Sequence, residues 1–388
     1  MKLNYKRLGD YLEPCNEKND GNIIKTLQGI SNRKYFQKAK TNTIGVDLSK
    51  YRVVRTGQFA FNRATTRNGD KISIALRRGK DCIVSPSYRI FKSKDENILN
   101  SEYLMMWFQR PDFDRYARYK SHGSAHEFFD WDEMQEVELP IPSIEKQREI
   151  VAEYNTIVNR IKLNETLNQK LEETAQALYK HWFVEKDIVL KSSNLASITS
   201  LITDGKHGNC KDEYNSGYYF LSAKDVRDFL VYENSREITK KDFDETHRRT
   251  NLQPYDICLV NTGATIGRMC LAPNNPKTYK STFQKSVAVI KPKENVTTSF
   301  FLYCLLKNRM KEIIELGKGT SQSNLLLGDL KEFEVEYPDF FLIKEFDLKV
   351  NPIYKQIEIN YYENLCLIKI KDLLLSKMSK AETKTAEA

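Results

Sequence analysis

The sequence predicts an α+β protein built from two copies of one domain, each followed by a long helix. The first observation is a repeat: residues 136–140 (EVELP) recur as residues 334–338 (EVEYP), 198 positions later. The same offset holds, with apolar positions in phase, for 101–108 with 299–306 and for 57–61 with 255–259. Because about 80 residues keep this offset without a gap, the repeating unit is a whole domain and not a short solenoid repeat.

The second observation is a change of pattern after Pro142. Residues 143–182 hold no glycine and no proline, and their apolar side chains recur at the alternating four- and three-residue spacing of a helix that pairs with another helix. The recurring positions are Ile150, Tyr154, Ile157, Ile161, Asn164, Leu171, Ala175, Leu178 and Trp182, with Asn168 in the remaining slot. We therefore expect one helix of about 40 residues, roughly 60 Å long.

The end of the chain repeats this helical pattern. Its recurring positions are Ile357, Tyr361, Asn364, Ile368, Lys371, Leu375 and Met378. We expect the second helix to have Pro352 in its first turn and Asn351 as its cap, because proline is favoured there. Asn364 follows Asn164 by 200 residues and not by 198, which indicates a small insertion between Pro338 and Ile357.

Asn164 and Asn364 occupy equivalent positions of the two predicted helices. Two interpretations remain open. The two amides are either polar interruptions near exposed helix surface, or a buried pair that fixes the register of the helices at some cost in stability.

Short strands bounded by turn-forming residues are predicted near 51–54, 82–84, 257–260 and 286–290. A helix is predicted over 100–109, ended by the Arg110–Pro111 junction, and its counterpart begins near Thr298. The predicted boundaries are 1–142 for the first domain, 143–185 for the first long helix, 186–340 for the second domain, 341–380 for the second long helix and 381–388 for a polar, disordered tail.

Composition narrows the class of protein. The chain has 388 residues, 40% of them apolar and 29% charged, as in ordinary globular proteins. The sequence has no apolar run long enough for a transmembrane helix and no signal-peptide pattern, so we expect a cytoplasmic protein that does not enter a membrane. Its seven cysteines form no C-x-x-C pair, which fits reduced thiols. The net charge of +9 suits a polyanionic partner, of which nucleic acid is the leading candidate.

Catalytic patterns are sparse. The five histidines form no H-E-x-x-H pattern or other metal-binding cluster, so we expect no metal and no catalytic residue in this chain. Asp339, Asp347 and Lys349 resemble the carboxylate–lysine signature of many nucleases. The first copy has no counterpart of residues 347–349 at the matching place, which argues against a duplicated nuclease.

Polar loops occupy matching positions in the two copies: 62–69 with 261–268, each after a predicted strand, and 121–126 with 319–324. Arginine, amide and hydroxyl side chains recognise base edges in the major groove, so we predict DNA contacts here. The predicted contacts are Asn62, Arg63, Thr65, Thr66, Arg67, Asn68, His122, Ser124, Asn261, Thr262, Thr265, Arg268, Thr320, Ser321, Gln322 and Ser323. Ordinary turns share this composition, so for any single residue both interpretations remain open.

The chain resembles the specificity subunits of type I restriction-modification systems over essentially its whole length. The segments that carry the resemblance are 255–268 (YDICLVNTGATIGR), 319–325 (GTSQSNL) and 139–151 (LPIPSIEKQREIV). The first copy departs from the family pattern at Thr65, where the glycine seen at Gly263 is expected. Residues 340–349 lack the compact P-x-x-E-Q-x-x-I form, which puts the start of the second long helix in doubt.

The resemblance implies two target-recognition domains, each recognising one half of a split double-stranded DNA sequence. It also implies that the long helices pair as an antiparallel coiled coil and dock methyltransferase subunits, two in number, which methylate adenine at N6 and are joined by motor-nuclease (restriction) subunits. S-adenosylmethionine, ATP and magnesium would then bind the partners and no cofactor would bind this chain. We expect the subunit interface to depend on Ile157, Ile161, Asn164, Leu171, Leu178, Asn364, Ile368 and Leu375.

Two other functions remain open. One is a DNA endonuclease that uses Asp339, Asp347 and Lys349; incubation of the protein with magnesium and plasmid DNA distinguishes it. The other is a coiled-coil scaffold whose domains bind proteins; strong salt-dependent DNA binding would exclude it.

Overall fold

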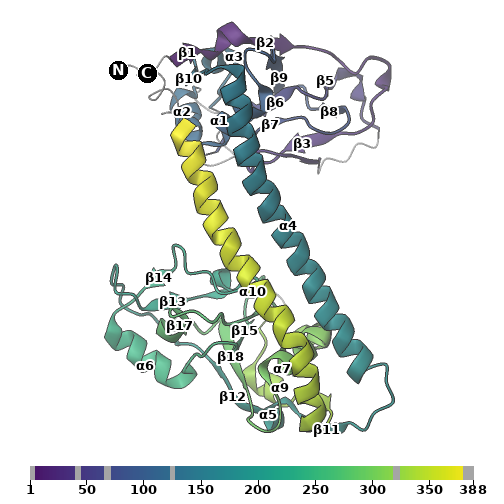
Figure 1. Cartoon of the computed structure of the whole chain (residues 1–388), viewed down its shortest axis with the longest axis vertical. Helices are drawn as coiled ribbons and strands as arrows, with labels where there is room; N and C mark the ends of the chain where they lie inside the picture. The colour runs from purple at the N-terminus through teal and green to yellow at the C-terminus, as the bar shows by residue number, and fades with distance from the viewer. Residues whose placement is uncertain (1–4, 40–44, 65–70, 123–126, 318–323, 379–388) are drawn as a thin grey trace. The chain divides into compact units, whose positions relative to one another are not determined.

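The computed structural model of the chain describes residues 5–39, 45–64, 71–122, 127–317 and 324–378. Contacts between Cα atoms divide the chain into two compact units. Unit 1 comprises residues 1–162 and 365–388, and unit 2 comprises residues 163–364. The two long helices, α4 (Ile144–Phe183) and α10 (Phe340–Lys377), each contribute one part to either unit (Figure 1).

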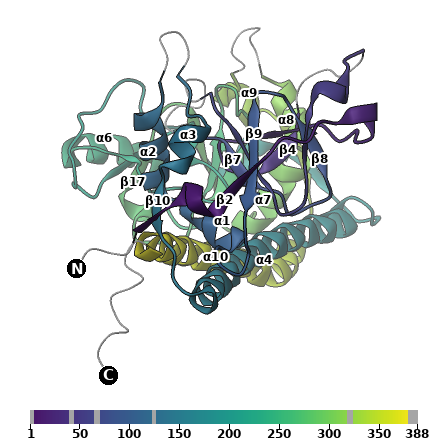
Figure 2. The ribbon, with the colours of Figure 1, turned by 90° about the horizontal axis from the view of Figure 1, so that it is seen from above.

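Unit 1 is centred on an antiparallel four-stranded sheet with the order β2 (Leu12–Cys15), β9 (Tyr88–Ser93), β6 (Phe59–Asn62) and β7 (Ile74–Leu76). Three strand pairs accompany it: β1 (Tyr5–Arg7) with β10 (Glu138–Pro140), β3 (Gln28–Ile30) with β4 (Phe36–Lys38), and β5 (Arg52–Val54) with β8 (Cys82–Val84). Its shorter helices are α1 (Ser101–Gln109), α2 (Pro111–Lys120) and α3 (Trp131–Gln135). Figure 2 shows α1 lying against α4.

Unit 2 repeats this plan. Its four-stranded sheet has the order β12 (Thr199–Asp204), β18 (Val287–Pro292), β15 (Ile257–Val260) and β16 (Met269–Leu271). A second sheet has the order β14 (Arg236–Glu237), β13 (Tyr219–Leu221) and β17 (Ser281–Phe283), and β11 (Lys191–Asn194) pairs with β19 (Glu334–Tyr337). Its shorter helices are α5 (Leu195–Ile198), α6 (Lys240–Thr250), α7 (Ser299–Asn308), α8 (Met310–Glu315) and α9 (Leu327–Lys331).

The repeat predicted from the sequence is therefore a repeat of structure. Strand β6 matches β15 as an inner strand of its sheet, and helix α1 matches α7. Both helices begin near the predicted residues, and each has a polar cap: the Asn100 side chain accepts a hydrogen bond from the Tyr103 backbone amide, and the Thr298 hydroxyl accepts one from the Phe301 amide. The α+β prediction with two homologous domains is confirmed.

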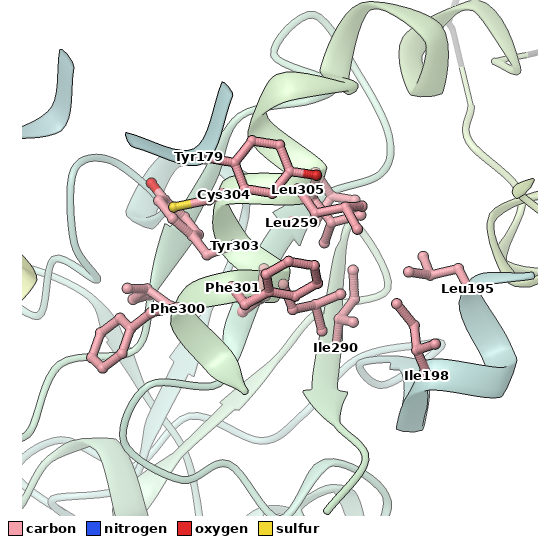
Figure 3. Close-up of a cluster of buried hydrophobic side chains, with 14 of the residues drawn as sticks. Tyr179, Leu195, Ile198, Leu259, Ile290, Phe300, Phe301, Tyr303, Cys304 and Leu305 are labelled. Atoms are coloured by element: carbon pink, nitrogen blue, oxygen red, sulfur yellow. The ribbon is translucent and has the colours of Figure 1, made fainter. Parts of the chain in front are cut away.

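Each unit buries an aromatic core between its sheet and its helices. In unit 1 the rings of Phe59 and Phe91 stack with centroids 4.9 Å apart. In unit 2, Leu259 and Ile290 of the sheet lie beside Phe301 of α7, and Tyr179 of α4 belongs to the same cluster (Figure 3). Part of each long helix is thus packed into the core of a domain, which fixes the helix to that domain.

The helices α4 and α10 pair antiparallel within unit 2. Asn164 contacts Asn364 and Asn168 contacts Asn360, so the residue number falls along α10 as it rises along α4. In unit 1, Tyr154 of α4 and Leu375 of α10 belong to one buried cluster. The predicted antiparallel pairing of the helices is confirmed.

The prediction that α10 begins in the turn that contains Pro352 is wrong. The helix begins at Phe340, and Asp339 caps it by accepting hydrogen bonds from the backbone amides of Phe341 and Leu342. Pro352 lies inside the helix, where it lacks the amide hydrogen that would continue the hydrogen-bond ladder. Ile343, Phe346 and Val350, all buried in unit 2, stabilise the turns before it.

Candidate nucleic-acid interface

In each unit, the first predicted recognition loop begins at the equivalent end of that unit's four-stranded sheet. In unit 1 the loop follows β6, whose last residue Asn62 pairs with Tyr88 of β9. In unit 2 the loop follows β15, whose last residue Val260 pairs with Val287 of β18. Because the two sheets share one strand order, the loops occupy equivalent places in the two domains.

The structure brings the two loops of each domain together. In unit 1, Ala64 forms an isolated β-bridge with Phe128, and the Phe129 amide donates to the Arg63 carbonyl at 2.8 Å. In unit 2, the Thr262 hydroxyl donates to Asn324 Oδ1 at 2.8 Å, and the Leu325 amide donates to the Asn261 carbonyl at 2.8 Å. Segments that are about 60 residues apart in sequence thus form one polar surface per domain.

Arg63 is held by the protein itself. Its guanidinium donates to Asp130 at 2.9 Å and lies over the Phe128 ring, 4.6 Å from the ring centroid. Arg89 donates to the same carboxylate at 2.8 Å. Partial burial would raise the pKa of Asp130, but the hydrogen bonds from Arg89 and Arg63 hold it below its ordinary value. These two arginines therefore fasten β9 and the first loop to the start of α3.

The other described candidates of unit 1 differ in exposure. Asn62 is half-buried, and its side chain accepts a hydrogen bond from the Ala64 amide at 3.2 Å, which shapes the start of the loop. His122 is exposed, and its backbone exchanges two hydrogen bonds with Phe128. The side chain of His122 is thus the more available of the two for a ligand.

In unit 2 the loop after β15 contains four candidates: one is buried, two, Thr262 and Arg268, are half-buried, and one is exposed. Asn261 is buried. Its backbone forms hydrogen bonds with Ser286, just before β18, and with Leu325, so this residue connects the end of β15 to those two segments. Thr265 is exposed. Arg268 is half-buried, and within the described residues no carboxylate pairs with its guanidinium. The guanidinium of Arg268, the one arginine in the sequence of this loop, is therefore available to DNA.

Glycine is required where this loop approaches α8. Gly267 has a φ of +84°, and a Cβ atom there would lie 2.5 Å from Ile314 Cδ1. Gly263 also has a positive φ, of 98°. Both glycines have the positive φ that favours glycine, and Gly267 also allows the loop to pass close to α8.

Nine predicted contacts lie outside the described residues. They are Thr65, Thr66, Arg67, Asn68, Ser124, Thr320, Ser321, Gln322 and Ser323. The sequence prediction also missed basic side chains near the same sheet ends, namely Arg89 in unit 1 and His207, Arg249 and Lys285 in unit 2. No motif marks these four residues, because they reach the sheet ends from a strand, a helix and separate loops.

The residues predicted for the subunit interface take part in packing within the chain. Asn164 and Asn364 bond each other, Leu375 is buried in unit 1, and Leu171 and Leu178 pack against the core of unit 2. Ile157 and Ile161 are half-buried, whereas Ile368 is exposed. Some apolar side chains of the long helices lie outside the recurring positions predicted from the sequence, and these are exposed as well: Leu163 (56%), Leu167 (41%), Ile359 (59%), Ile370 and Leu373.

Asp339 and Asp347, the carboxylates of the nuclease alternative, have structural roles at helix α10. Asp339 caps its first turn, and Asp347 accepts a hydrogen bond from the Thr298 hydroxyl at 2.7 Å, where burial raises the pKa of the carboxyl. Within the described ranges, no three metal-ligating side chains cluster, and no helix has the length and apolarity to span a membrane.

Comparison with known proteins agrees with this geometry. The family model of the type I restriction modification DNA specificity domain matches residues 11–173 and again residues 194–340. The chain is 25% identical over 315 residues to the type I restriction enzyme MjaIX specificity subunit of Methanocaldococcus jannaschii, covering 74% of this chain and 70% of that protein. It is 24% identical over 162 residues to the HindI specificity subunit of Haemophilus influenzae, covering 41% and 35%.

A solved structure shares the fold. The type I restriction-modification system S subunit from M. genitalium superposes with a TM-score of 0.61 at 17% identity, covering 97% of this chain and 96% of that one. The family model matches both copies of the repeat and well over half of the chain. The chain belongs to the family of type I restriction-modification DNA specificity proteins.

Proposed function

We propose that this chain is the non-catalytic subunit that gives a type I restriction-modification complex its DNA sequence specificity. Each domain recognises one half of a bipartite target through the polar surface at its sheet end. The observation that carries the proposal is the duplication of that surface, with two loops joined beside an inner strand in each unit. Two equivalent surfaces suit two half-sites.

The chemistry of these surfaces suits DNA. Hydroxyl, amide, imidazole and guanidinium groups gather there, and the whole chain carries a net charge of +9. Amide and guanidinium groups recognise bases, and lysines and arginines contact phosphates. Base-edge contacts would supply selectivity, whereas phosphate contacts would supply most of the salt-dependent affinity.

The long helices would dock the methyltransferase subunits. Leu163, Leu167 and Ile359 in unit 2 and Ile370 and Leu373 in unit 1 expose apolar side chains on helices whose other faces are packed. Such side chains favour helix–helix contact with a partner. One methyltransferase for each half of the duplicated chain accounts for two such subunits. S-adenosylmethionine would bind those subunits, and ATP and magnesium would serve the motor-nuclease subunits that join them.

The test is reconstitution with the cognate methyltransferase subunit. The purified complex is incubated with genomic DNA and S-adenosylmethionine, and methylated adenines are mapped by sequencing. A single split target sequence supports the proposal, whereas random methylation or none contradicts it. Two controls separate the alternatives: plasmid cleavage by the chain alone with magnesium would support the nuclease, and absence of salt-dependent DNA binding would support the scaffold.

A further inference from the structure

A cavity of about 410 Å³ in unit 1 is lined by twelve residues, four of which have cationic side chains. Arg33, Lys34, Lys71 and Lys371 face it, against two carboxylates, Asp114 and Asp372. It lies where the tip of the β3–β4 hairpin, the segment before β7 and the helices α4 and α10 meet. In unit 1, α4 and α10 run side by side past α1 and α2 (Figure 1).

Two of these cations lack an acidic partner. Asp114 pairs with Lys34 at 2.8 Å, and Asp372 lies 4.0 Å from Lys371. Within the described residues, no carboxylate forms an ion pair with Arg33 or Lys71. The cavity therefore has an excess of two positive charges, and like charges that surround one space repel each other unless an anion lies between them.

The cavity is built on a buried ion pair. Only 6% of the Lys34 side chain is exposed, and its ammonium group donates to Asp114 and to the Phe108 carbonyl. Lys34 adopts a φ of +65°, a left-handed conformation that is unfavourable for a residue other than glycine. The buried contacts of its side chain hold it there, and they fix Arg33 at the tip of the hairpin.

The same carboxylate positions Lys71. Asp114 Oδ1 accepts a hydrogen bond from the Ile72 amide at 3.2 Å, directly after Lys71. On the other wall, the Tyr154 hydroxyl of α4 donates to Gln109 at the end of α1. The cationic side chains are thus carried on segments that are fixed by internal hydrogen bonds, and Asn32 and Gln109 add amide groups to the lining.

We propose that this cavity binds a phosphate group through Arg33, Lys71 and Lys371. A phosphate oxygen accepts hydrogen bonds from guanidinium and ammonium groups, and its negative charge offsets the unpaired cations. Resting on the proposed function, we favour a phosphodiester of the DNA backbone as the source, because Lys71 lies two residues after the end of the recognition loop 62–69. A free phosphate or nucleotide offers the same chemistry.

The second domain does not repeat this site. The 198-residue offset replaces Lys71 by Met269 and Gln109 by Lys307. Lys307 pairs with Glu172 of α4 at 3.0 Å, so its charge is already neutralised. Within the described residues, unit 2 therefore lacks the counterpart of Lys71, and its lysine at the position of Gln109 is paired.

The test compares the Arg33→Ala/Lys71→Ala double variant with Lys80→Ala. Lys80 is an exposed lysine after the other end of β7, so it controls for the loss of a surface charge. Arg33 and Lys71 are both exposed in the wild-type chain, so we expect the double variant to retain the fold. DNA affinity of the complete methyltransferase complex is measured against salt concentration, and thermal unfolding of the purified chain is measured in phosphate and in chloride at equal ionic strength.

The salt slope is the decrease in the logarithm of the DNA-binding constant with the logarithm of salt concentration. If both side chains contact one DNA phosphate, the slope of the double variant is smaller by about 0.9, and if they contact two phosphates, it is smaller by about twice that amount. Lys80→Ala keeps the wild-type slope. The methylated sequence stays the same, because phosphate contacts carry no sequence information. If phosphate raises the melting temperature of wild type but not of the double variant and the slope is unchanged, the ligand is a free phosphate.

If neither readout distinguishes the double variant from wild type, the phosphate site is refuted. A Lys371→Ala variant provides an independent check, since Lys371 approaches the cavity from α10. The proposed function fails separately, by loss of split-site methylation in the wild-type complex, so failure of the phosphate site and failure of the function are distinguishable.

Discussion

Asn164 Nδ2 donates to Asn364 Oδ1 at 2.9 Å, and the two residues are only 1% and 8% exposed. One turn further along, Asn360 Nδ2 donates to Asn168 Oδ1 at 2.8 Å. Both asparagine pairs form together in one register only, because sliding either helix by a turn leaves at most one pair of asparagines facing each other. Of the two interpretations open from the sequence, the buried pair that fixes register is the one the structure supports.

Asn164→Leu should destabilise the chain by about 1–3 kcal/mol, because it leaves the Asn364 amide buried without this partner. The Asn164→Leu/Asn364→Leu double variant should recover much of that stability, since both polar groups are gone. Urea unfolding of the three proteins measures this. A single variant as stable as wild type would count against the buried amide pair. So would a double variant whose free energy of unfolding falls by twice the loss seen in the single variant.

Arg268→Ala should weaken binding of the methyltransferase complex to its target by about 1–3 kcal/mol and relax the sequence at one position of one half-site. Arg63→Ala is the matched comparison. Because Arg63 bonds Asp130, its loss should lower the melting temperature. Arg268→Ala should leave the melting temperature nearly unchanged. Melting curves and methylation maps for both variants separate the two roles; an unchanged target and affinity for Arg268→Ala would remove it from the interface.

Glu358→Gln should stabilise unit 2 more at high pH than at low pH. Burial raises the pKa of Glu358, which accepts hydrogen bonds from the Asn274 amide and the Tyr255 hydroxyl. A raised folded pKa makes the wild-type contribution complete below the unfolded pKa of about 4.3, and this contribution is lost as pH rises through the folded value. The unfolding free energy of the variant minus that of wild type should therefore grow with rising pH above about 4.3. A difference that is flat or falls with pH contradicts this assignment.

Leu163→Asp and Leu171→Asp should fail in different ways. Leu163 is exposed, so its change should alter stability by no more than about 0.5 kcal/mol while weakening assembly with the methyltransferase. Leu171 packs against the core of unit 2, so its change should lower the melting temperature and weaken assembly indirectly. Melting curves and size-exclusion chromatography of the complexes provide the comparison. Normal assembly by Leu163→Asp would exclude that part of α4 from the interface.

The repeat and the starts of α1 and α7 were predictable because they depend on local residue types. Asn100 and Thr298 precede apolar helical segments, and each accepts the hydrogen bond expected of a cap. The start of α10 was not predictable from Pro352, because buried contacts of Phe346 and Val350 compensate for a proline inside the helix. Proline is a local signal, whereas its tolerance depends on tertiary packing.

The candidate site was predictable as a pair of loops but not residue by residue. The pairing of Thr262 with Asn324 follows from the matching loops, and no such signal links Arg63 to Asp130, 67 residues away. The recurring four- and three-residue spacing of the second long helix also did not include Asn360. It selects the neighbouring Tyr361, which lies 200 residues after Ile161. Long-range partners decide whether a polar side chain contacts DNA or holds the fold.

The central claim, that two homologous domains recognise two independent half-sites, is tested most directly by a domain exchange. Residues 1–140 are replaced by the matching segment of a relative with a different target, and methylated adenines are mapped in DNA modified by the reconstituted complex. We predict that one half of the split sequence changes to that of the donor while the other half and the gap between them stay the same. A hybrid that changes both halves, or neither, contradicts the account.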